Sequence, residues 1–405
     1  MKPIVRAERM KPVHSDIRGP LYVEAMKRQK QGIDILKLNT GNPATFGFGL
    51  PDSIRNVLME HMQDGVGYCD FKGMPQARQA ICDYETSKGI KGITPDDVFI
   101  GNGVSEVVSF ALTPLLNDGD EVLVPSPSYS LWGNSVYLED GKPVFYTCDE
   151  KAGWYPDIQD IRSKITDKTK AIAIINPNNP TGVLYPKEIL LEIIQVAREF
   201  GLLIFSDEIY DRLVMDGKQH ISLASLTEDV PVITLNGLSK SHCLCGYRCG
   251  WMVISGPREL TEDYRQGIIQ LTSLRLCANT MAQIVIPAAL DDMETPASMV
   301  RPGGRIYEQR EATIRELEKI DGLSFIKNDA AFYVFPKLDV KKFNITNDKQ
   351  FAHDLLDATN ILLVPGSGFD WKDPDHFRIV MLPQADVLSD AIRRMGTFLD
   401  GYKQK

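Results

Sequence analysis

Short apolar runs alternate with amphipathic helical stretches from about residue 97 onwards. The runs are nearly continuous in Val, Ile and Leu, and they are VFIG (98–101), EVLVP (121–125), AIAII (171–175), LLIF (202–205), VITL (232–235) and WMVI (251–254). Between them the spacing of apolar residues predicts helices at 104–116 and 187–200. Strands that are apolar on both faces are typical of a mostly parallel sheet covered by helices on both sides. The pattern therefore predicts an α/β fold.

The pattern changes after about residue 300. A charged helix is expected at 304–319, followed by the strand-like runs LSFIK and AFYVF, a helix at 348–358, the runs ILLVP and FRIVML, and a last helix near 386–399. This mixture predicts a smaller α+β unit, with 257–300 as the bridge to it. We expect an N-terminal arm with part of the small domain at 1–44, a large domain at 45–295 and a small domain at 296–405. A length of 405 residues agrees with two domains.

Composition and charge narrow the classes of function. The formal net charge of −9 argues against a nucleic-acid partner, which normally requires a basic surface. No apolar run approaches the ~20 residues of a membrane span, and the start MKPIVRAERMKPVHSD has no apolar signal region. The seven cysteines are too irregularly spaced for a disulfide framework. A cytoplasmic location is the simplest expectation.

Polar and glycine-rich motifs follow the predicted strands, and they are GNGVS, PSPSY, NPNNPTG, SDEIY and GLSK. Ligands of open α/β sheets bind at the carboxyl ends of strands, so one large site is expected there. Each motif also has a purely structural interpretation. NPNNPTG is compatible with a simple turn, SDEIYD with a helix that begins at a capping Asp207, and Lys240 with a solvated or helix-capping lysine.

Taken in order, the motifs, with Lys240 and with Arg248 eight residues later, resemble the class I pyridoxal-phosphate aminotransferases of fold type I. The resemblance runs from LNTGNP (38–43) to HFRIVML (376–382). DIRGP, GYCDFKG and NPNNPTG are most similar to the bacterial alanine (glutamate–pyruvate) aminotransferases. The resemblance implies a cytoplasmic homodimer that binds pyridoxal 5'-phosphate and converts L-alanine and 2-oxoglutarate to pyruvate and L-glutamate by a ping-pong reaction.

The resemblance also assigns the residues that act on the cofactor ring. Lys240 would form the Schiff base and then move the proton as general base and acid. Asp207 would pair with the pyridine nitrogen and keep it protonated. Tyr210 and Asn179 would donate to the phenolate oxygen, and Tyr129 would stack on the ring.

The cofactor phosphate is expected at the start of the helix near residue 103. The backbone amides of Val104 and Ser105, the Ser105 hydroxyl, Ser239 and the Arg248 guanidinium would hold it. Gly237 stands where many relatives carry a Ser or Thr that touches the phosphate, and Ser239 is assigned in its place.

Three further residues follow from the resemblance, and a fourth follows from the chemistry of the substrates. Tyr68 would reach the phosphate of the neighbouring subunit. Arg378 would grip the substrate α-carboxylate, helped by the backbone N–H of Gly41. Arg18 is the candidate for the second carboxylate of glutamate, with the alternative that it anchors the N-terminal arm.

Other functions remain open on the sequence alone. They are an aromatic or broad transaminase, a pyridoxal-phosphate C–S lyase and a non-enzymatic amino-acid sensor. A lyase would release pyruvate from a cysteine conjugate without a second keto acid, and a sensor usually needs a DNA-binding module, which is not apparent here. No metal is expected, because Cys243, Cys245 and Cys249 have no second ligand cluster and are better explained as packing residues.

Overall fold

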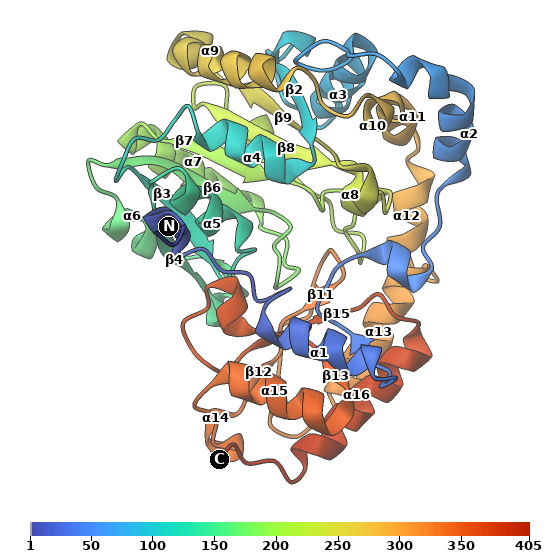
Figure 1. Cartoon of the computed structure of the whole chain (residues 1–405). Coiled ribbons are helices and arrows are strands. Elements are labelled where there is room, and N and C mark those ends of the chain that lie inside the picture. Colours follow the sequence, from blue (N-terminus) through green and yellow to red (C-terminus); the bar gives the residue numbers. More distant parts are fainter. Residues whose placement is uncertain (1) are drawn as a thin grey trace.

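A computed structural model describes residues 2–405, and an eight-stranded sheet lies at the centre of its larger part (Figure 1). The strands are β2 (Val98–Asn102), β3 (Glu121–Ser126), β4 (Lys142–Asp149), β5 (Tyr155–Pro156), β6 (Thr169–Ile175), β7 (Leu203–Asp207), β8 (Val232–Gly237) and β9 (Cys249–Ser255). They follow the order β2-β9-β8-β7-β6-β3-β4-β5, and the five strands from β8 to β4 are parallel. The predicted α/β fold with a mostly parallel sheet is confirmed.

Both faces of the sheet are buried. Successive residues of each strand point to opposite faces, and the side chains on both faces pack into apolar cores. Ile172 and Ile174 of β6 pack in one core with Leu190 and Ile193, whereas Ala173 packs in another core on the opposite face. The first core is covered by α6 (Ile158–Lys164) and α7 (Lys187–Phe200), and the second by α4 (Val104–Leu112), α5 (Leu131–Leu138) and α9 (Arg258–Arg275). This double cover explains why the strands read as unbroken apolar runs.

Two details of the large sheet differ from the prediction. The helix expected at 104–116 ends at Leu112, two residues before Pro114, whose nitrogen has no hydrogen to continue a helix. Strand β4 was not among the predicted runs. It lies next to the short edge strand β5, and its partly exposed residues alternate with buried ones, so it has no continuous apolar run.

The residues beyond the large sheet form smaller sheets and helices. Strands β11 (Tyr333–Val334), β15 (Phe377–Val380) and β14 (Val364–Pro365) form one antiparallel sheet, β1 (Leu36–Lys37) pairs with β13 (Ile361–Leu362), and β10 (Leu323–Ser324) pairs with β12 (Lys337–Leu338). The helices are α1 (Pro20–Lys30), α13 (Arg305–Leu317), α14 (Val340–Phe343), α15 (Asp348–Thr359) and α16 (Ala385–Leu399). The runs LSFIK and AFYVF are thus only two-residue strands. The pairing of β1 with β13 joins the N-terminal residues to this part, while the domain boundaries at 44 and 295 stay a prediction.

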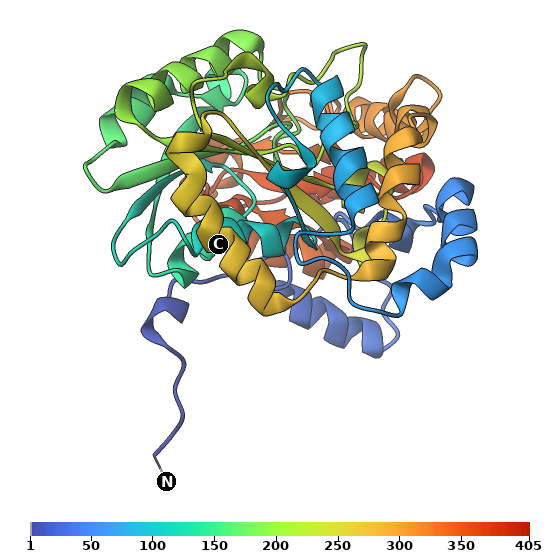
Figure 2. The same cartoon turned by 90° about the horizontal axis from the view of Figure 1, so that it is seen from above.

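Short helices link or flank these parts. They are α2 (Asp52–His61), α3 (Pro75–Ser87), α8 (Leu238–Ser241), α10 (Thr280–Ile284), α11 (Ile286–Asp291) and α12 (Glu294–Val300). Figure 2 shows the first N-terminal residues extending away from the rest of the chain. The stretch expected to bridge the two parts, 257–300, is therefore almost wholly helical.

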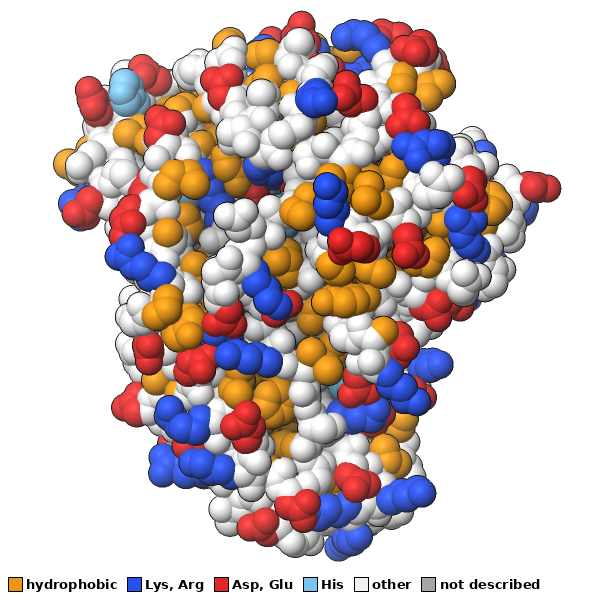
Figure 3. All heavy atoms as spheres, turned by 180° about the vertical axis from the view of Figure 1, so that it is seen from behind, with side chains coloured by type: hydrophobic (Ala, Val, Ile, Leu, Met, Phe, Trp, Pro, Cys, Tyr) orange, Lys and Arg blue, Asp and Glu red, His pale blue; other side chains and the backbone are white. Residues whose placement is uncertain are grey.

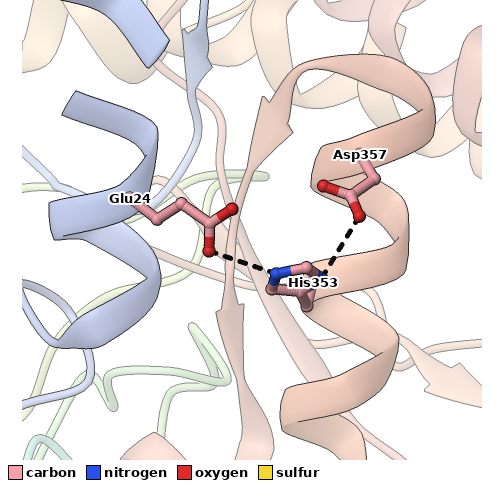
Figure 4. Close-up of side chains that lie close together, drawn as sticks. All are labelled: Glu24, His353 and Asp357. Atoms are coloured by element: carbon pink, nitrogen blue, oxygen red, sulfur yellow. Dashed lines mark ion pairs between the residues drawn. The ribbon is translucent and has the colours of Figure 1, made fainter. Parts of the chain in front are cut away.

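An ion-pair cluster fixes α1 against α15 (Figure 4). His353 lies between two carboxylates, 3.1 Å from Glu24 Oε2 and 3.3 Å from Asp357 Oδ2. Arg28 of α1 pairs with the same two carboxylates. Because Arg28 already pairs with both carboxylates, the cluster acts as a tie between the N-terminal helix and the C-terminal part.

The surface carries charges of both signs. Figure 3 shows Lys and Arg side chains interspersed with Asp and Glu over one face. Within residues 2–405 no helix combines the length and apolar character needed to cross a membrane.

Candidate active site

A cavity of about 860 Å³ lies at the carboxyl ends of the central strands. Twelve of the thirteen residues predicted to form a site line it, and these are Arg18, Gly41, Val104, Ser105, Tyr129, Asn179, Asp207, Tyr210, Ser239, Lys240, Arg248 and Arg378. The exception is Tyr68, whose side chain is exposed. The fold therefore brings together residues from nearly the whole chain, and their individual roles stay predictions.

Lys240 projects into this cavity from α8, directly after β8. Its Nζ donates to the carbonyl oxygen of Gly41 at 2.8 Å and lies 4.0 Å from the Cys245 Sγ. The same Nζ is 5.7 Å from the centre of the Phe332 ring. The amine thus lies inside the cavity among neutral partners.

Asp207 ends β7 and is 4% exposed. Its carboxylate accepts hydrogen bonds from Trp132 Nε1 and from the backbone N–H of Ile209, both at 3.3 Å. Burial raises the pKa of Asp207 to about 6, because these two long bonds do not replace the lost water. The residues after Asp207 form turns, so its interpretation as the cap of a helix is wrong. A buried carboxylate of this kind favours a bound cation.

Arg378 enters from β15 and is 1% exposed. Its Nη1 donates to Asn179 Oδ1 at 2.9 Å, and its Nη2 donates to the carbonyl of Asn39. The guanidinium carbon lies 4.5 Å from the centre of the Tyr333 ring. Burial lowers the pKa of Arg378, and its Nε has no hydrogen-bond partner among residues 2–405. A carboxylate ligand would supply the missing acceptor and the missing charge.

The start of α4 forms a concave backbone surface next to Arg248. Gly103 has φ +85°, and a Cβ there would lie 2.3 Å from Arg248 Nη2. A Cβ on Gly250 would lie 2.5 Å from the nitrogen of Val104. The first backbone N–H groups of a helix have no partner within the helix, and an arginine beside them adds a fixed positive charge. The surface suits a phosphate, and Ser105 and Ser239 also line the cavity there.

The cavity is closed on one side by the N-terminal segment. The backbone of His14 exchanges two hydrogen bonds with the side chain of Asn134, at 3.1 and 2.6 Å, and His14 Nε2 lies 3.0 Å from Asp370 Oδ1. Asn39 Nδ2 donates to the carbonyl of Ile17 at 2.8 Å. The exposed Arg18 follows directly and lines the cavity.

Comparison with known proteins agrees with this geometry. The family model for aminotransferase class I and II matches residues 33–394. The chain belongs to this family.

Similar proteins extend the match to the whole chain. A glutamate-pyruvate aminotransferase, AlaA, of Haemophilus influenzae is 48% identical over 404 residues, which cover all of both chains. A solved aminotransferase from Escherichia coli has a TM-score of 0.98 and 46% identity, again over all of both chains. The alanine aminotransferase from Pyrococcus furiosus has a TM-score of 0.92 and 40% identity, and the match covers 98% of this chain and all of that one.

Sequence reasoning missed several residues at the site of this aminotransferase. Tyr333 lines the cavity and shares a hydrogen bond with Tyr210, with 2.9 Å between the hydroxyl oxygens, and Trp132 donates to Asp207. Trp132 lies in the first turn of α5, three residues after Tyr129, which precedes the helix. Nothing in the local sequence distinguishes Tyr333 from other strand residues, because only the fold brings it to Tyr210.

The three clustered cysteines of the aminotransferase have different surroundings. Cys243 Sγ lies 3.8 Å from Met299 Sδ, and Cys249 is buried in β9. Cys245 lines the cavity, and its thiol donates to the carbonyl of Ser239 at 2.9 Å.

Proposed function

We propose that the protein is a pyridoxal 5'-phosphate-dependent aminotransferase that converts L-alanine and 2-oxoglutarate to pyruvate and L-glutamate. The proposal rests on one observation. Lys240, the buried Asp207 and the buried Arg378 line one cavity, next to the surface at the start of α4 that suits a phosphate. The similarity to glutamate-pyruvate and alanine aminotransferases supports the choice of substrates.

The residues fit the cofactor on structural grounds. Asp207 is a buried carboxylate that forms no ion pair among residues 2–405, and the pyridine nitrogen of the cofactor supplies a cation when it is protonated. The surface around Gly103, Val104 and Arg248 suits the phosphate. When bound, pyridoxal phosphate supplies an aldehyde that takes up the amino group and a ring that accepts electrons from the substrate Cα.

The chain's own residues then position the ligand and move a proton. Lys240 Nζ holds the cofactor and afterwards takes and returns the Cα proton as general base and acid. Asp207 keeps the ring nitrogen protonated. Tyr210 and Asn179 donate to the ring oxygen, and Tyr129 packs on the ring face.

Recognition of the substrates needs two cationic groups. Arg378 binds the α-carboxylate shared by all four substrates, since among residues 2–405 its Nε lacks a partner and its buried charge has no counter-ion. The backbone N–H of Gly41 completes this contact. The second carboxylate of glutamate is assigned to Arg18, on the N-terminal segment that borders the cavity. Alanine has no such group, so Arg18 matters for one substrate pair only.

A second copy of the chain completes the site through Tyr68. The Tyr68 side chain is 83% exposed, and Val66, Met62 and Met59 nearby in sequence are also largely exposed. Several large apolar side chains exposed close together are typical of a protein contact. We therefore propose a homodimer, located in the cytoplasm, in which Tyr68 reaches the phosphate site of its partner.

A panel of amino donors and keto acceptors tests the proposed function. Purified protein loaded with pyridoxal phosphate is expected to form pyruvate from L-alanine in repeated turnovers only when 2-oxoglutarate is present, with one L-glutamate formed per pyruvate. Without 2-oxoglutarate, pyruvate formation should stop at one molecule per active site. Lys240→Ala is the matched control for background reaction. Pyruvate release from a cysteine conjugate without a keto acid would identify a lyase, and faster transfer from tyrosine or phenylalanine than from alanine would identify an aromatic transaminase.

A further inference from the structure

Tyr333 contacts groups of the cavity that come from different parts of the fold. It lies in β11, is 2% exposed, and is paired in the sheet with Val380 of β15. Its hydroxyl oxygen is 2.9 Å from that of Tyr210, and its ring faces the Arg378 guanidinium. A Cβ on Gly41 would lie only 2.3 Å from the Tyr333 hydroxyl, so the N-terminal segment is packed closely against it.

The two hydroxyls share one hydrogen bond, and each has one proton to donate. If Tyr210 donates to Tyr333, it has no proton left for a ligand in the cavity. If Tyr333 donates to Tyr210, the Tyr210 proton is free for that ligand. Burial, with the nearby Tyr333 adding to it, holds the pKa of Tyr210 well above its usual range, so this hydroxyl keeps its proton at neutral pH.

The charge of Arg378 decides between the two directions. Its guanidinium carbon lies 4.5 Å from the centre of the Tyr333 ring, and a cation on the ring face withdraws electrons from the phenol. The Tyr333 hydroxyl is therefore the better donor and the poorer acceptor. Arg378 acts on Tyr210 as well, but there the Asp207 carboxylate, three residues earlier at the end of β7, adds negative charge that opposes it.

We propose that Tyr333 is a positioning residue whose hydroxyl donates to Tyr210 and thereby directs the Tyr210 proton to the ring oxygen of the bound cofactor. The inference rests on the proposed function, because it assumes that the cofactor oxygen faces Tyr210. Without the Tyr333 proton, Tyr210 is a weaker donor, and the anionic form of that oxygen is less stable.

The pH titration of the visible absorbance of the loaded enzyme tests the inference. Tyr333→Phe keeps the ring under Arg378 and removes only the hydroxyl. The midpoint of the titration is expected to rise by about half a pH unit, the size expected for one weakened neutral hydrogen bond. Tyr307→Phe is the matched control, since Tyr307 also has an arginine over its ring, with the Arg310 carbon 4.7 Å away, but lies outside the cavity lining.

The double variant Tyr210→Phe/Tyr333→Phe shows whether Tyr333 acts through Tyr210. Its midpoint is expected to equal that of Tyr210→Phe alone. An unchanged midpoint in Tyr333→Phe would overturn the inference. It would also be overturned if Tyr333→Phe raised the midpoint by the same amount in wild type and in Tyr210→Phe. Wild-type protein that develops no visible absorbance would refute the proposed function instead.

Discussion

Replacing Asp207 by Asn is expected to stabilise the cofactor-free protein at neutral pH and to remove most of the transaminase activity. Both effects have the same cause. The Asp207 carboxylate is 4% exposed and, within the described residues 2–405, has only two hydrogen bonds, each 3.3 Å long. Its charge is costly when the cavity is empty, and it is needed when a cationic ring nitrogen is bound.

The size of the first effect follows from the pKa of Asp207. Burial raises this pKa from 3.8 to about 6, so the folded protein binds the proton more tightly than the unfolded chain does. The contribution of Asp207 to the free energy of unfolding is therefore at its full size below the pKa of the unfolded state. It is lost as the pH rises through the pKa of the folded state. The loss amounts to about 3 kcal/mol above pH 6.5, and to about half of that at pH 5. Asn does not titrate and avoids the loss.

Urea unfolding of cofactor-free wild type and Asp207→Asn at pH 5 and pH 7.5 measures this difference. The gain in stability of the variant is expected to grow by roughly 1.5 kcal/mol between the two pH values. The exposed Asp373→Asn is the control and should give no such trend. The loaded variant should transaminate roughly a thousandfold more slowly, about 4 kcal/mol in the barrier. A stability difference independent of pH, or a rate within about threefold of wild type, would show that Asp207 does not have the assigned role.

Four other predictions concern the remaining site residues. Lys240→Ala should abolish transamination, and borohydride treatment of the loaded wild type should attach the cofactor to the peptide that contains Lys240; label on another lysine would refute the assignment. A mixture of inactive Lys240→Ala and Tyr68→Phe chains should regain part of the wild-type activity through mixed dimers, whereas a fully active monomer in sedimentation at the assay concentration would exclude a shared site. Arg378→Ala should lower kcat/KM by a hundredfold or so for L-alanine and L-glutamate alike, as expected for a lost buried charge-assisted contact of about 3 kcal/mol. Arg18→Ala should lower kcat/KM for L-glutamate at least tenfold more than for L-alanine, and equal losses would reduce Arg18 to an anchor of the N-terminal segment.

The sequence predicted the large sheet well because its strands are buried on both faces. A strand that is buried on both faces is a continuous apolar run, which can be recognised from the local sequence alone, as in AIAII of β6. The small sheets were less predictable. Runs such as AFYVF contain only two residues in strand conformation, because antiparallel pairing there depends on neighbours far away in the chain.

The same distinction applies to the candidate site. Lys240 and Asp207 stand at strand ends beside characteristic motifs, so they were found before the fold was known. Tyr333 and Trp132 have no motif, and their importance arises from contacts to residues 123 and 75 positions away. Long-range polar contacts of this kind leave no periodic signal in the sequence.

The tight backbone around the phosphate cradle has a consequence for how this enzyme can be altered. At Gly103 and Gly250 any added side chain would meet neighbouring atoms at 2.3 to 2.5 Å, so selection in the laboratory should return almost no substitutions there. Another part of the lining consists of ordinary side chains such as Ser15, Ile17 and Leu138, which belong to the N-terminal segment and to α5. A library confined to that part can change the accepted amino acid while leaving the cradle intact. The fold thus separates a part that tolerates redesign from a part that does not.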